Sequence, residues 1–195
     1  KNIEAMNFIE VYDNALTSTQ CKDIINFIDS SVLHKAELDG KVQPDIKDCW
    51  QSPADDTHLN QDNIAAKHLK EVLFDKTKDY IEKYPELNTS LGRWVLLSSY
   101  NLQKYNPKQG YPKVHCEQGT ADVSLRMLVW MIYLNTVTDD GGTEFPQHNK
   151  ITDAVEGRLV LWPAGWTHMH RGITSNTQTK YIATGWYEFV LSNLS

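Results

Sequence analysis

Metal-binding side chains occur at two points in the C-terminal half of the sequence. His115 and Glu117 are two residues apart in a segment whose composition predicts a β-strand, and alternate side chains of a strand point to the same face. One strand would therefore present an imidazole and a carboxylate together. A histidine from another strand would complete a triad of two histidines and one carboxylate, which leaves metal positions open and suits Fe(II) oxygenases. On residue type alone, His168 and His170 both qualify as that histidine.

A pair of the type His-x-Glu is by itself a weak signal, because two half-exposed strand residues often produce it. The rest of the chain gives the pair a context, since residues suited to tight turns, metal binding and carboxylate binding surround it in a fixed order. That order is Tyr105, Gly110-Tyr111, His115-x-Glu117, Arg126, Tyr133-Leu134-Asn135, Gly141-Gly142-Thr143, Phe145-Pro146, Pro163, His170-x-Gly172, Lys180 and Trp186.

This order and spacing resemble the prolyl 4-hydroxylase family, including its small microbial and viral members, over nearly the whole chain. The resemblance implies that His115, Glu117 and His170 bind iron. His170 is favoured over His168 because it lies ten residues before Lys180 and belongs to a His-x-Gly run, as in the family. In collagen-type members, a lysine ten residues after the second iron-binding histidine pairs with the far carboxylate of 2-oxoglutarate. The resemblance implies the same role for Lys180.

The resemblance also assigns roles to two tyrosines, and the sequence differs from the usual family pattern at two places. The resemblance implies that Tyr133 helps Lys180 to hold the far carboxylate, and that Tyr105 contacts the oxo acid near the metal. Glu117 stands where the family usually has aspartate, so the side chain must fold or the metal must shift to keep ligand distances near ~2 Å. A Gly-Gly-Thr-Glu run at 141–144 stands where the family commonly has Gly-Gly-Glu-Thr. Neither departure removes a group that the chemistry needs.

The implied activity is that of a procollagen-proline 4-dioxygenase-like hydroxylase. Such an enzyme uses Fe(II), O2 and the cosubstrate 2-oxoglutarate to hydroxylate an unactivated C–H bond, and it releases succinate and CO2. The implied substrate is peptidyl proline in a peptide or protein. Ascorbate binding is expected as well, because ascorbate would reduce oxidised iron. Related halogenases lack the carboxylate ligand, so the presence of Glu117 favours hydroxylation.

Two other functions fit part of the pattern. The same iron and oxo-acid residues would serve a dioxygenase that acts on a free amino acid or small metabolite, since the motifs do not specify the primary substrate. A cupin-like metal-binding module without catalytic activity would share the triad, but it would need neither Lys180 nor Tyr133. A test of 2-oxoglutarate binding separates this module from both enzymes.

Two helices are expected in the N-terminal half of the chain. After a short apolar strand at 8–12, the Thr-Ser-Thr-Gln sequence at 17–20 is a capping box, which predicts a helix over 18–30. Apolar residues with helical spacing predict a longer helix over 63–84, which Pro85 ends.

A long loop and a β-rich half make up the rest. Residues 40–60 show no periodicity and are expected to form a surface loop that could act as a lid. From residue 93 onward, β-branched and aromatic residues alternate with Gly, Pro, Asn and Asp clusters, which is typical of strands and turns. Strands are expected near 93–101, 111–117, 124–135, 158–162, 166–173 and 179–190.

Helices ahead of such a series predict a mainly β fold with N-terminal helices. The family resemblance implies a double-stranded β-helix, a cupin-like jelly roll braced by two helices, as a single Fe(II)/2-oxoglutarate dioxygenase domain over 1–195. Because alternate side chains of a strand share a face, two strands are expected to line the same cavity. The residues on the two faces are Lys180, Ile182, Thr184 and Trp186 on one, and Met127, Val129, Met131 and Tyr133 on the other.

Composition limits the partners. With 195 residues and a net charge of −6, the chain offers no basic stripe for nucleic acid or an anionic membrane, and neither is expected as a partner. No apolar run approaches the ~18 residues of a membrane span. The three cysteines, Cys21, Cys49 and Cys116, form no CxxC motif, which favours a reducing, cytoplasmic setting. A monomer is expected, with Cys21 in its core.

The remaining residues of chemical interest are expected to be structural. His58, His68 and His148 have no ligand partners at strand spacing and are expected at the surface. Arg126 and Arg158 are expected in surface ion pairs and stay outside the site. Four tryptophans are expected to be core or rim residues, namely Trp50, Trp130, Trp162 and Trp166.

Overall fold

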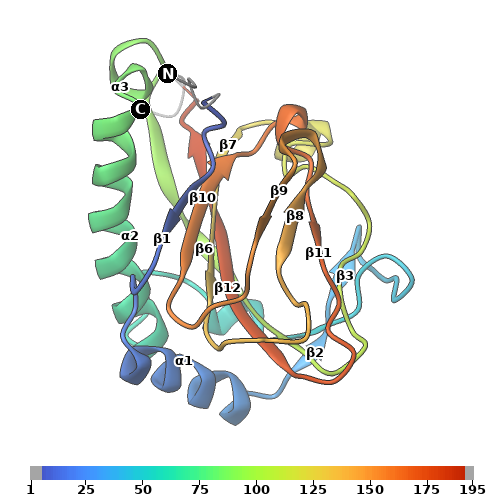
Figure 1. The fold of residues 1–195 in the computed structure, drawn as a ribbon. Coiled ribbons are helices and arrows are strands. Elements are labelled where there is room, and N and C mark those ends of the chain that lie inside the picture. The colour runs from blue at the N-terminus through green and yellow to red at the C-terminus, as the bar shows by residue number, and fades with distance from the viewer. Residues whose placement is uncertain (1–5, 192–195) are drawn as a thin grey trace.

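The computed structural model describes residues 6–191, in which two helices lie along the outer side of a large β-sheet (Figure 1). Helix α1 spans Ser18–Ser30 and begins with the expected capping box at Thr17. Helix α2 spans Ile64–Lys83, and the short helix α3 follows at Glu86–Thr89. Both expected helices are therefore confirmed to within one residue at each end.

Seven antiparallel strands form the large sheet, in the order β1-β10-β7-β12-β6-β5-β2. A sheet of three strands, in the order β11-β8-β9, faces it, and the hairpin β3-β4 stands apart (Figure 1). The bounds in the large sheet are β1 Glu10–Tyr12, β10 Leu159–Pro163, β7 Arg126–Tyr133, β12 Lys180–Phe189, β6 Trp94–Tyr105, β5 Trp50–Gln51 and β2 His34–Lys35. The others are β11 Arg171–Gly172, β8 Thr143–Phe145, β9 Lys150–Thr152, β3 Glu37–Leu38 and β4 Lys41–Val42.

This arrangement is the double-stranded β-helix that the family resemblance implies, with helices bracing one face. The alternation of β7 shows how the large sheet separates two cores. Trp130 and Ile132 pack toward α1 and α2, whereas Val129, Met131 and Tyr133 pack between the two sheets. Nearly all of these side chains are fully buried. The helices thus close the outer face, and the space between the sheets is left for a site.

Two of the expected strands are wrong. Residues 111–117 form no regular strand, and only an isolated bridge joins His115 to His170. Pro112 lies in this segment and lacks an N–H for a strand ladder. The expected strand at 166–173 begins instead with a 3-10 turn over Trp166–His168 and keeps only the short strand β11.

The expected long loop at 40–60 is also partly wrong, since it contains β4, β5 and a 3-10 turn at Ala54–Asp56. Strand β5 pairs with the end of β6, so this segment extends the large sheet. Strands β8 and β9 were not expected either. All of these elements are only two or three residues long, too short for a periodic pattern to show.

Irregular pairing at the end of β12 changes which side chains face inward. Opposite β7, Tyr187 pairs with Leu128 and Glu188 with Arg126, so Met127 is the extra residue of a β-bulge. A bulge turns the following side chains to the other face. Met127 accordingly packs on the helix side, which corrects the parity prediction, and Arg126 turns toward the space between the sheets.

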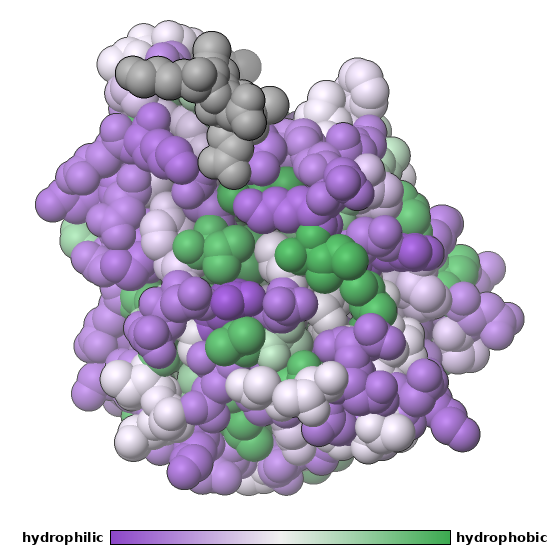
Figure 2. All heavy atoms as spheres, viewed as in Figure 1, coloured by the Kyte–Doolittle hydropathy of each residue, from purple (hydrophilic) through white to green (hydrophobic). Residues whose placement is uncertain are grey.

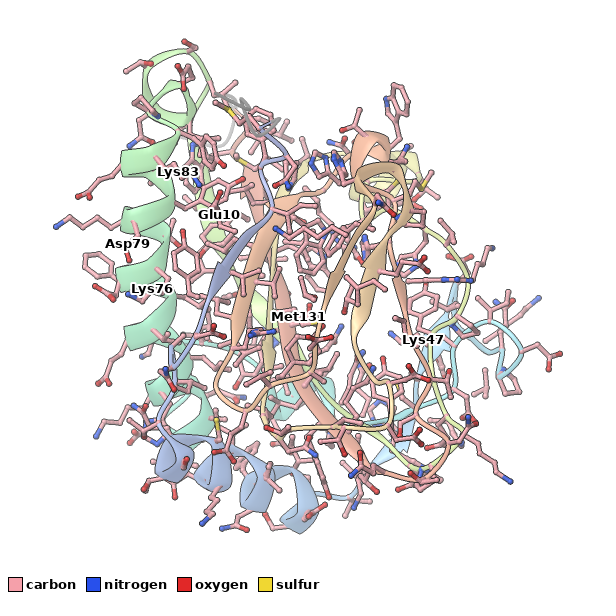
Figure 3. The ribbon with its side chains drawn as sticks, viewed as in Figure 1. Glu10, Lys47, Lys76, Asp79, Lys83 and Met131 are labelled. Atoms are coloured by element: carbon pink, nitrogen blue, oxygen red, sulfur yellow. The ribbon has the colours of Figure 1, made fainter. Side chains whose placement is uncertain are left out.

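The edge strand β1 is tied to α2 by polar contacts. Lys83 Nζ lies 2.7 Å from Glu10 Oε1, and the Tyr84 hydroxyl donates to the same oxygen at 2.5 Å (Figure 3 labels Glu10 and Lys83). On the face in Figure 2, hydrophilic residues surround several separate hydrophobic patches. Within residues 6–191, no helix is long and apolar enough to cross a membrane.

The cysteines are unpaired, as expected. Cys21 is fully buried in α1, where burial raises the pKa of its thiol to about 12. A thiol that stays protonated in the core is unreactive, which agrees with the structural role expected of it.

Candidate active site

Three side chains converge between the two sheets. The Nε2 atom of His115 lies 3.3 Å from Glu117 Oε1, and the Nε2 atom of His170 lies 3.2 Å from the same oxygen. One ligand atom from each residue falls within 4.8 Å of the other two, a spacing that could hold a metal ion. The structure therefore brings together the three residues that the sequence predicts as ligands. They come from an irregular segment and an isolated bridge rather than from two regular strands.

Backbone carbonyls fix the orientation of both imidazoles. His115 Nδ1 lies 2.8 Å from the carbonyl oxygen of Lys113, and His170 Nδ1 lies 3.1 Å from that of His168. Because a carbonyl oxygen can only accept, each Nδ1 must donate a proton to it, and Nε2 is the ring nitrogen that faces Glu117. Hydrogen bonds of this kind orient metal-binding histidines in proteins.

The carboxylate of Glu117 is divided between two sets of partners. Its Oε1 faces the two histidines, while its Oε2 accepts from the Trp186 indole at 3.0 Å and lies 3.4 Å from Arg126 Nη1. Burial alone would raise the pKa of Glu117, but hydrogen bonds from His115 and His170 and their charge hold it well below its usual range. The carboxyl group is therefore ionised and fixed at both oxygens.

Arg126 belongs to this site, which corrects the expectation of a surface ion pair. Its guanidinium group stacks on the Trp186 ring at 3.8 Å from the ring centre, and its side chain is only 20% exposed. The bulge at Met127 explains why sequence parity missed it. Arg158, by contrast, pairs with Asp13 at 2.6 Å, as expected.

His168 lies outside the cluster, and both of its ring nitrogens are occupied. Its Nε2 lies 2.8 Å from the carbonyl oxygen of Asn7, so Nε2 must carry the proton. Its Nδ1 lies 3.0 Å from the Thr167 hydroxyl, and its ring stacks on His148. His168 lies in the 3-10 turn Trp166–His168 and not in the strand that was expected at 166–173.

Two other histidines, His68 and His148, have structural contacts. His68 is not free at the surface, because its Nε2 lies 2.9 Å from Asp23 Oδ2 and links α2 to α1. His148 contacts the carbonyl oxygen of Thr167 at 2.9 Å. Neither contact faces the candidate site.

The triad opens into a cavity of about 370 Å³ between the sheets. Lys180, Ile182, Thr184 and Trp186 all line it, which confirms the parity predicted for β12. Met131 lines it from β7, and Lys47 lines it from the segment after β4 (Figure 3). Trp162 closes it behind His170, in edge contact with that ring at 5.0 Å between centres. The hairpin β3-β4 contributes Glu37, Leu38 and Asp39.

Lys180 is a buried cation in the cavity wall. Lys180 is only 6% exposed. Its Nζ donates to the carbonyl oxygen of Gly141 at 3.0 Å. The same nitrogen lies 4.9 Å from the centre of the Tyr105 ring. Burial lowers the pKa of Lys180 to about 8. No carboxylate within residues 6–191 forms an ion pair with Lys180. An anion that entered the cavity would therefore offset the desolvation penalty of the buried amine.

The two tyrosines are placed differently. Tyr105 lines the cavity beside Lys180, with its hydroxyl donating to Gln103 Oε1 at 2.9 Å. Tyr133 lies behind the wall, and its hydroxyl is 2.7 Å from the hydroxyl of Thr143 and 3.0 Å from that of Thr152. Thr143 itself lines the cavity. Any influence of Tyr133 on a bound molecule would therefore pass through Thr143.

Sequence reasoning missed several lining residues. The motif spacing did not point to Asn101 or Gln103. They lie four and two residues before Tyr105 on β6, so strand alternation could have placed all three on the same face. Thr143 could have been found from the Gly-Gly-Thr-Glu run, where it directly follows the glycines.

Comparisons with known proteins agree with this geometry. Residues 100–188 match the 2OG-Fe(II) oxygenase superfamily. No curated protein matches the sequence. Solved structures of prolyl hydroxylases are similar to nearly the whole chain, and their low sequence identities show similarity of fold alone.

The first is a viral collagen prolyl hydroxylase from Paramecium bursaria Chlorella virus-1, in complex with 2OG. Its sequence is 16% identical to this chain, the TM-score is 0.70, and the alignment covers 96% of this chain and 99% of the viral chain. A Trichoplax adhaerens prolyl hydroxylase, in complex with a peptide of the hypoxia-inducible factor, is 20% identical with a TM-score of 0.73, covering 94% and 84%. A Pseudomonas putida prolyl-4-hydroxylase is 18% identical with a TM-score of 0.69, covering 94% of each chain. The resemblance read from the sequence is thus confirmed: residues 100–188 match the 2OG-Fe(II) oxygenase superfamily, and the fold is similar to that of prolyl hydroxylases.

Proposed function

We propose that the protein is an Fe(II)- and 2-oxoglutarate-dependent dioxygenase with His115, Glu117 and His170 as its iron ligands. The observation that carries the proposal is the convergence of two Nε2 atoms on one carboxylate oxygen, with both Nδ1 atoms occupied by backbone carbonyls. Two imidazoles and one carboxylate are the donor set of non-haem Fe(II) oxygenases, so the residues present fit the metal. Bound iron, with O2 and 2-oxoglutarate, would supply the oxidation of a C–H bond while the cosubstrate becomes succinate and CO2.

Lys180 would hold the far carboxylate of 2-oxoglutarate. A buried, positively charged amine with no ionic partner among the described residues is well suited to this, because the incoming carboxylate would offset the desolvation of the amine. Tyr105 lies beside Lys180 and would contact the oxo acid, and Tyr133 would hold the Thr143 hydroxyl in place. A metal-binding module without catalysis would have no use for such a lysine.

The protein groups around the triad would orient the ligands and exclude water. Trp186 and Arg126 hold the outer oxygen of Glu117, and Trp162 packs on His170. Ordered ligands in a shielded site favour oxidation of the substrate over side reactions. Ascorbate would support turnover by reducing iron that has become oxidised.

For the substrate, we propose peptidyl proline. The support is the prolyl hydroxylase fold and, in particular, the similarity to a Trichoplax adhaerens enzyme whose structure contains a peptide fragment of the hypoxia-inducible factor. The cavity is bordered by the hairpin β3-β4, where Glu37 and Asp39 are exposed to solvent, and we propose that the peptide approaches on this side.

The substrate proposal is tested by incubating the protein with Fe(II), 2-oxoglutarate, ascorbate and a panel of proline-containing peptides. We expect some peptides to gain the mass of one oxygen on proline, as measured by tandem mass spectrometry, with succinate formed in equal amount. Omission of 2-oxoglutarate is the control. If free amino acids or small metabolites gain oxygen while every peptide stays unchanged, the protein is a small-molecule dioxygenase instead.

A further inference from the structure

Four polar side chains on β5 and β6 form a continuous chain of hydrogen bonds along the cavity wall. The Tyr105 hydroxyl donates to Gln103 Oε1 at 2.9 Å, and Gln103 Nε2 donates to Gln51 Oε1 at 3.2 Å. Gln51 Nε2 then donates to Asn101 Oδ1 at 3.1 Å. Strand register makes this possible, because Gln51 lies directly opposite Gln103. We refer to Tyr105, Gln103, Gln51 and Asn101 as the carboxamide chain.

The fold alone does not explain these polar residues. Gln103 is only 2% exposed and faces the cavity together with apolar Ile182, its partner on β12. Buried carboxamides give little net stability even when they are fully hydrogen-bonded, and apolar residues of similar size would serve the sheet as well. Three carboxamides at one end of an inner sheet face therefore suggest a role in binding.

The chain of hydrogen bonds leaves one donor group open. Asn101 accepts from Gln51 through Oδ1, and within residues 6–191 its Nδ2 group has no hydrogen-bond partner. Asn101 lines the cavity beside Thr184, its partner on β12. The Thr184 hydroxyl is already bonded to the Trp130 carbonyl oxygen at 2.9 Å. The N–H groups of Asn101 are thus neutral donors that this part of the wall offers to a bound molecule, beside the cationic Arg126, whose Nε has no hydrogen-bond partner within residues 6–191.

The two ends of the carboxamide chain lie in different parts of the cavity. Tyr105 is next to Lys180, where the oxo acid would bind. Asn101 is four residues away on β6, which corresponds to about 13 Å along a strand. It lies on the side of Thr184 and Trp186, so the open donor belongs to the part of the cavity beyond the oxo-acid anchor.

We propose that Asn101, held by the carboxamide chain, binds the carbonyl oxygen of a backbone amide in the primary substrate. This inference rests on the proposed function and narrows it to substrates that carry a peptide bond. A neutral carboxamide matches a neutral amide in hydrogen bonding, whereas the carboxylate of a free amino acid is usually bound by a cation. Because Gln51 does not line the cavity, it is a positioning residue that orients Asn101.

The test uses Asn101→Asp, which keeps the size of the side chain and still accepts from Gln51 but loses both N–H donors. Asn88→Asp makes the same chemical change at an exposed position on α3 and is the matched control. Protein with Fe(II) and 2-oxoglutarate is titrated without oxygen, by calorimetry, with acetylated and amidated pentapeptides that contain a central proline, and separately with L-proline.

We expect Asn101→Asp to raise the Kd of the pentapeptides by about tenfold or more relative to wild type and Asn88→Asp. Its 2-oxoglutarate affinity should stay unchanged, which would show that the site is intact. L-proline should bind wild type much more weakly than the pentapeptides. Equal pentapeptide Kd values in wild type and Asn101→Asp, or a wild type that binds L-proline as well as the pentapeptides or binds no pentapeptide, would overturn the inference.

Mass spectrometry of the same peptides separates this inference from the proposed function. Peptides that bind through Asn101 but gain no oxygen would contradict the hydroxylase proposal and leave the amide subsite standing. Peptides that are hydroxylated equally by wild type and Asn101→Asp would support the hydroxylase proposal and overturn the amide subsite.

Discussion

Replacing Lys180 by alanine is expected to raise the 2-oxoglutarate concentration for half-maximal turnover by about 30-fold to 1000-fold. The estimate corresponds to the loss of an ion pair of about 2–4 kcal/mol in a desolvated pocket. Iron binding should change little, because Lys180 is not among the three clustered ligand atoms. The measurement is the rate of succinate formation against 2-oxoglutarate concentration, together with iron content.

Lys104→Ala is the matched control for this prediction. Lys104 lies next to Tyr105 on β6 but points to the other face, where it pairs with Asp29 at 2.7 Å. Its removal should leave the 2-oxoglutarate requirement unchanged. An unchanged requirement in Lys180→Ala would exclude Lys180 as the anchor.

The ionisation of Lys180 gives a second check on the same role. Burial lowers the pKa of Lys180 to about 8 in the protein without ligand, so the amine is mostly charged at pH 7 and mostly neutral at pH 9. Only the charged amine attracts a carboxylate. The 2-oxoglutarate requirement of the wild type should therefore rise as pH passes about 8, and Lys180→Ala should show no such rise.

Replacing His170 by alanine is expected to abolish both iron binding and 2-oxoglutarate decarboxylation. With His170 removed, only His115 and Glu117 of the cluster remain, and two ligands hold Fe(II) poorly. His168→Ala is the matched control, because His168 contacts the Asn7 carbonyl oxygen and His148 rather than the cluster. It should keep its iron and lose activity only in part. Iron content is measured by metal analysis after anaerobic reconstitution.

The opposite result for this pair would transfer the ligand role to His168. It would also weaken the assignment of Lys180, because the ten-residue step from His170 to Lys180 is the basis for both.

The sequence predicted those parts of the fold that depend on long, regular patterns. The capping box at 17–20 and the helical spacing over 63–84 gave α1 and α2 almost to the residue. The alternation from Lys180 to Trp186 correctly placed one side of β12 in the cavity. These elements follow from local interactions and from burial of one face, which a single sequence displays directly.

Elements that depend on pairing with distant residues were not predicted. Strand β5 has only two residues and owes its position to β6, about fifty residues later in the chain. The bulge at Met127 results from the register between β7 and β12, so parity alone placed Met127 on the wrong side of the sheet. Such features are set by tertiary contacts and leave no periodic signal.

In the candidate site, too, residues with a sequence pattern were predicted and features set by distant pairing were not. The residues of the triad and Lys180 were found from their order and spacing, and they do lie around one cavity. His115 and Glu117 do not share a strand face as expected, since an isolated bridge and a turn position them instead. The carboxamide chain could not be predicted, because Gln51 meets Asn101 only when β5 pairs with β6.

We propose that this cavity uses Fe(II) to couple oxidation to the decarboxylation of 2-oxoglutarate. The most direct measurement is succinate formation by the purified protein in air, with 2-oxoglutarate and either Fe(II) or Zn(II) as the only added metal. Zinc binds similar ligands but has no redox chemistry. We predict one succinate for each 2-oxoglutarate consumed with Fe(II), and none with Zn(II). Equal succinate with both metals, or none with Fe(II) although iron is bound, would contradict the claim.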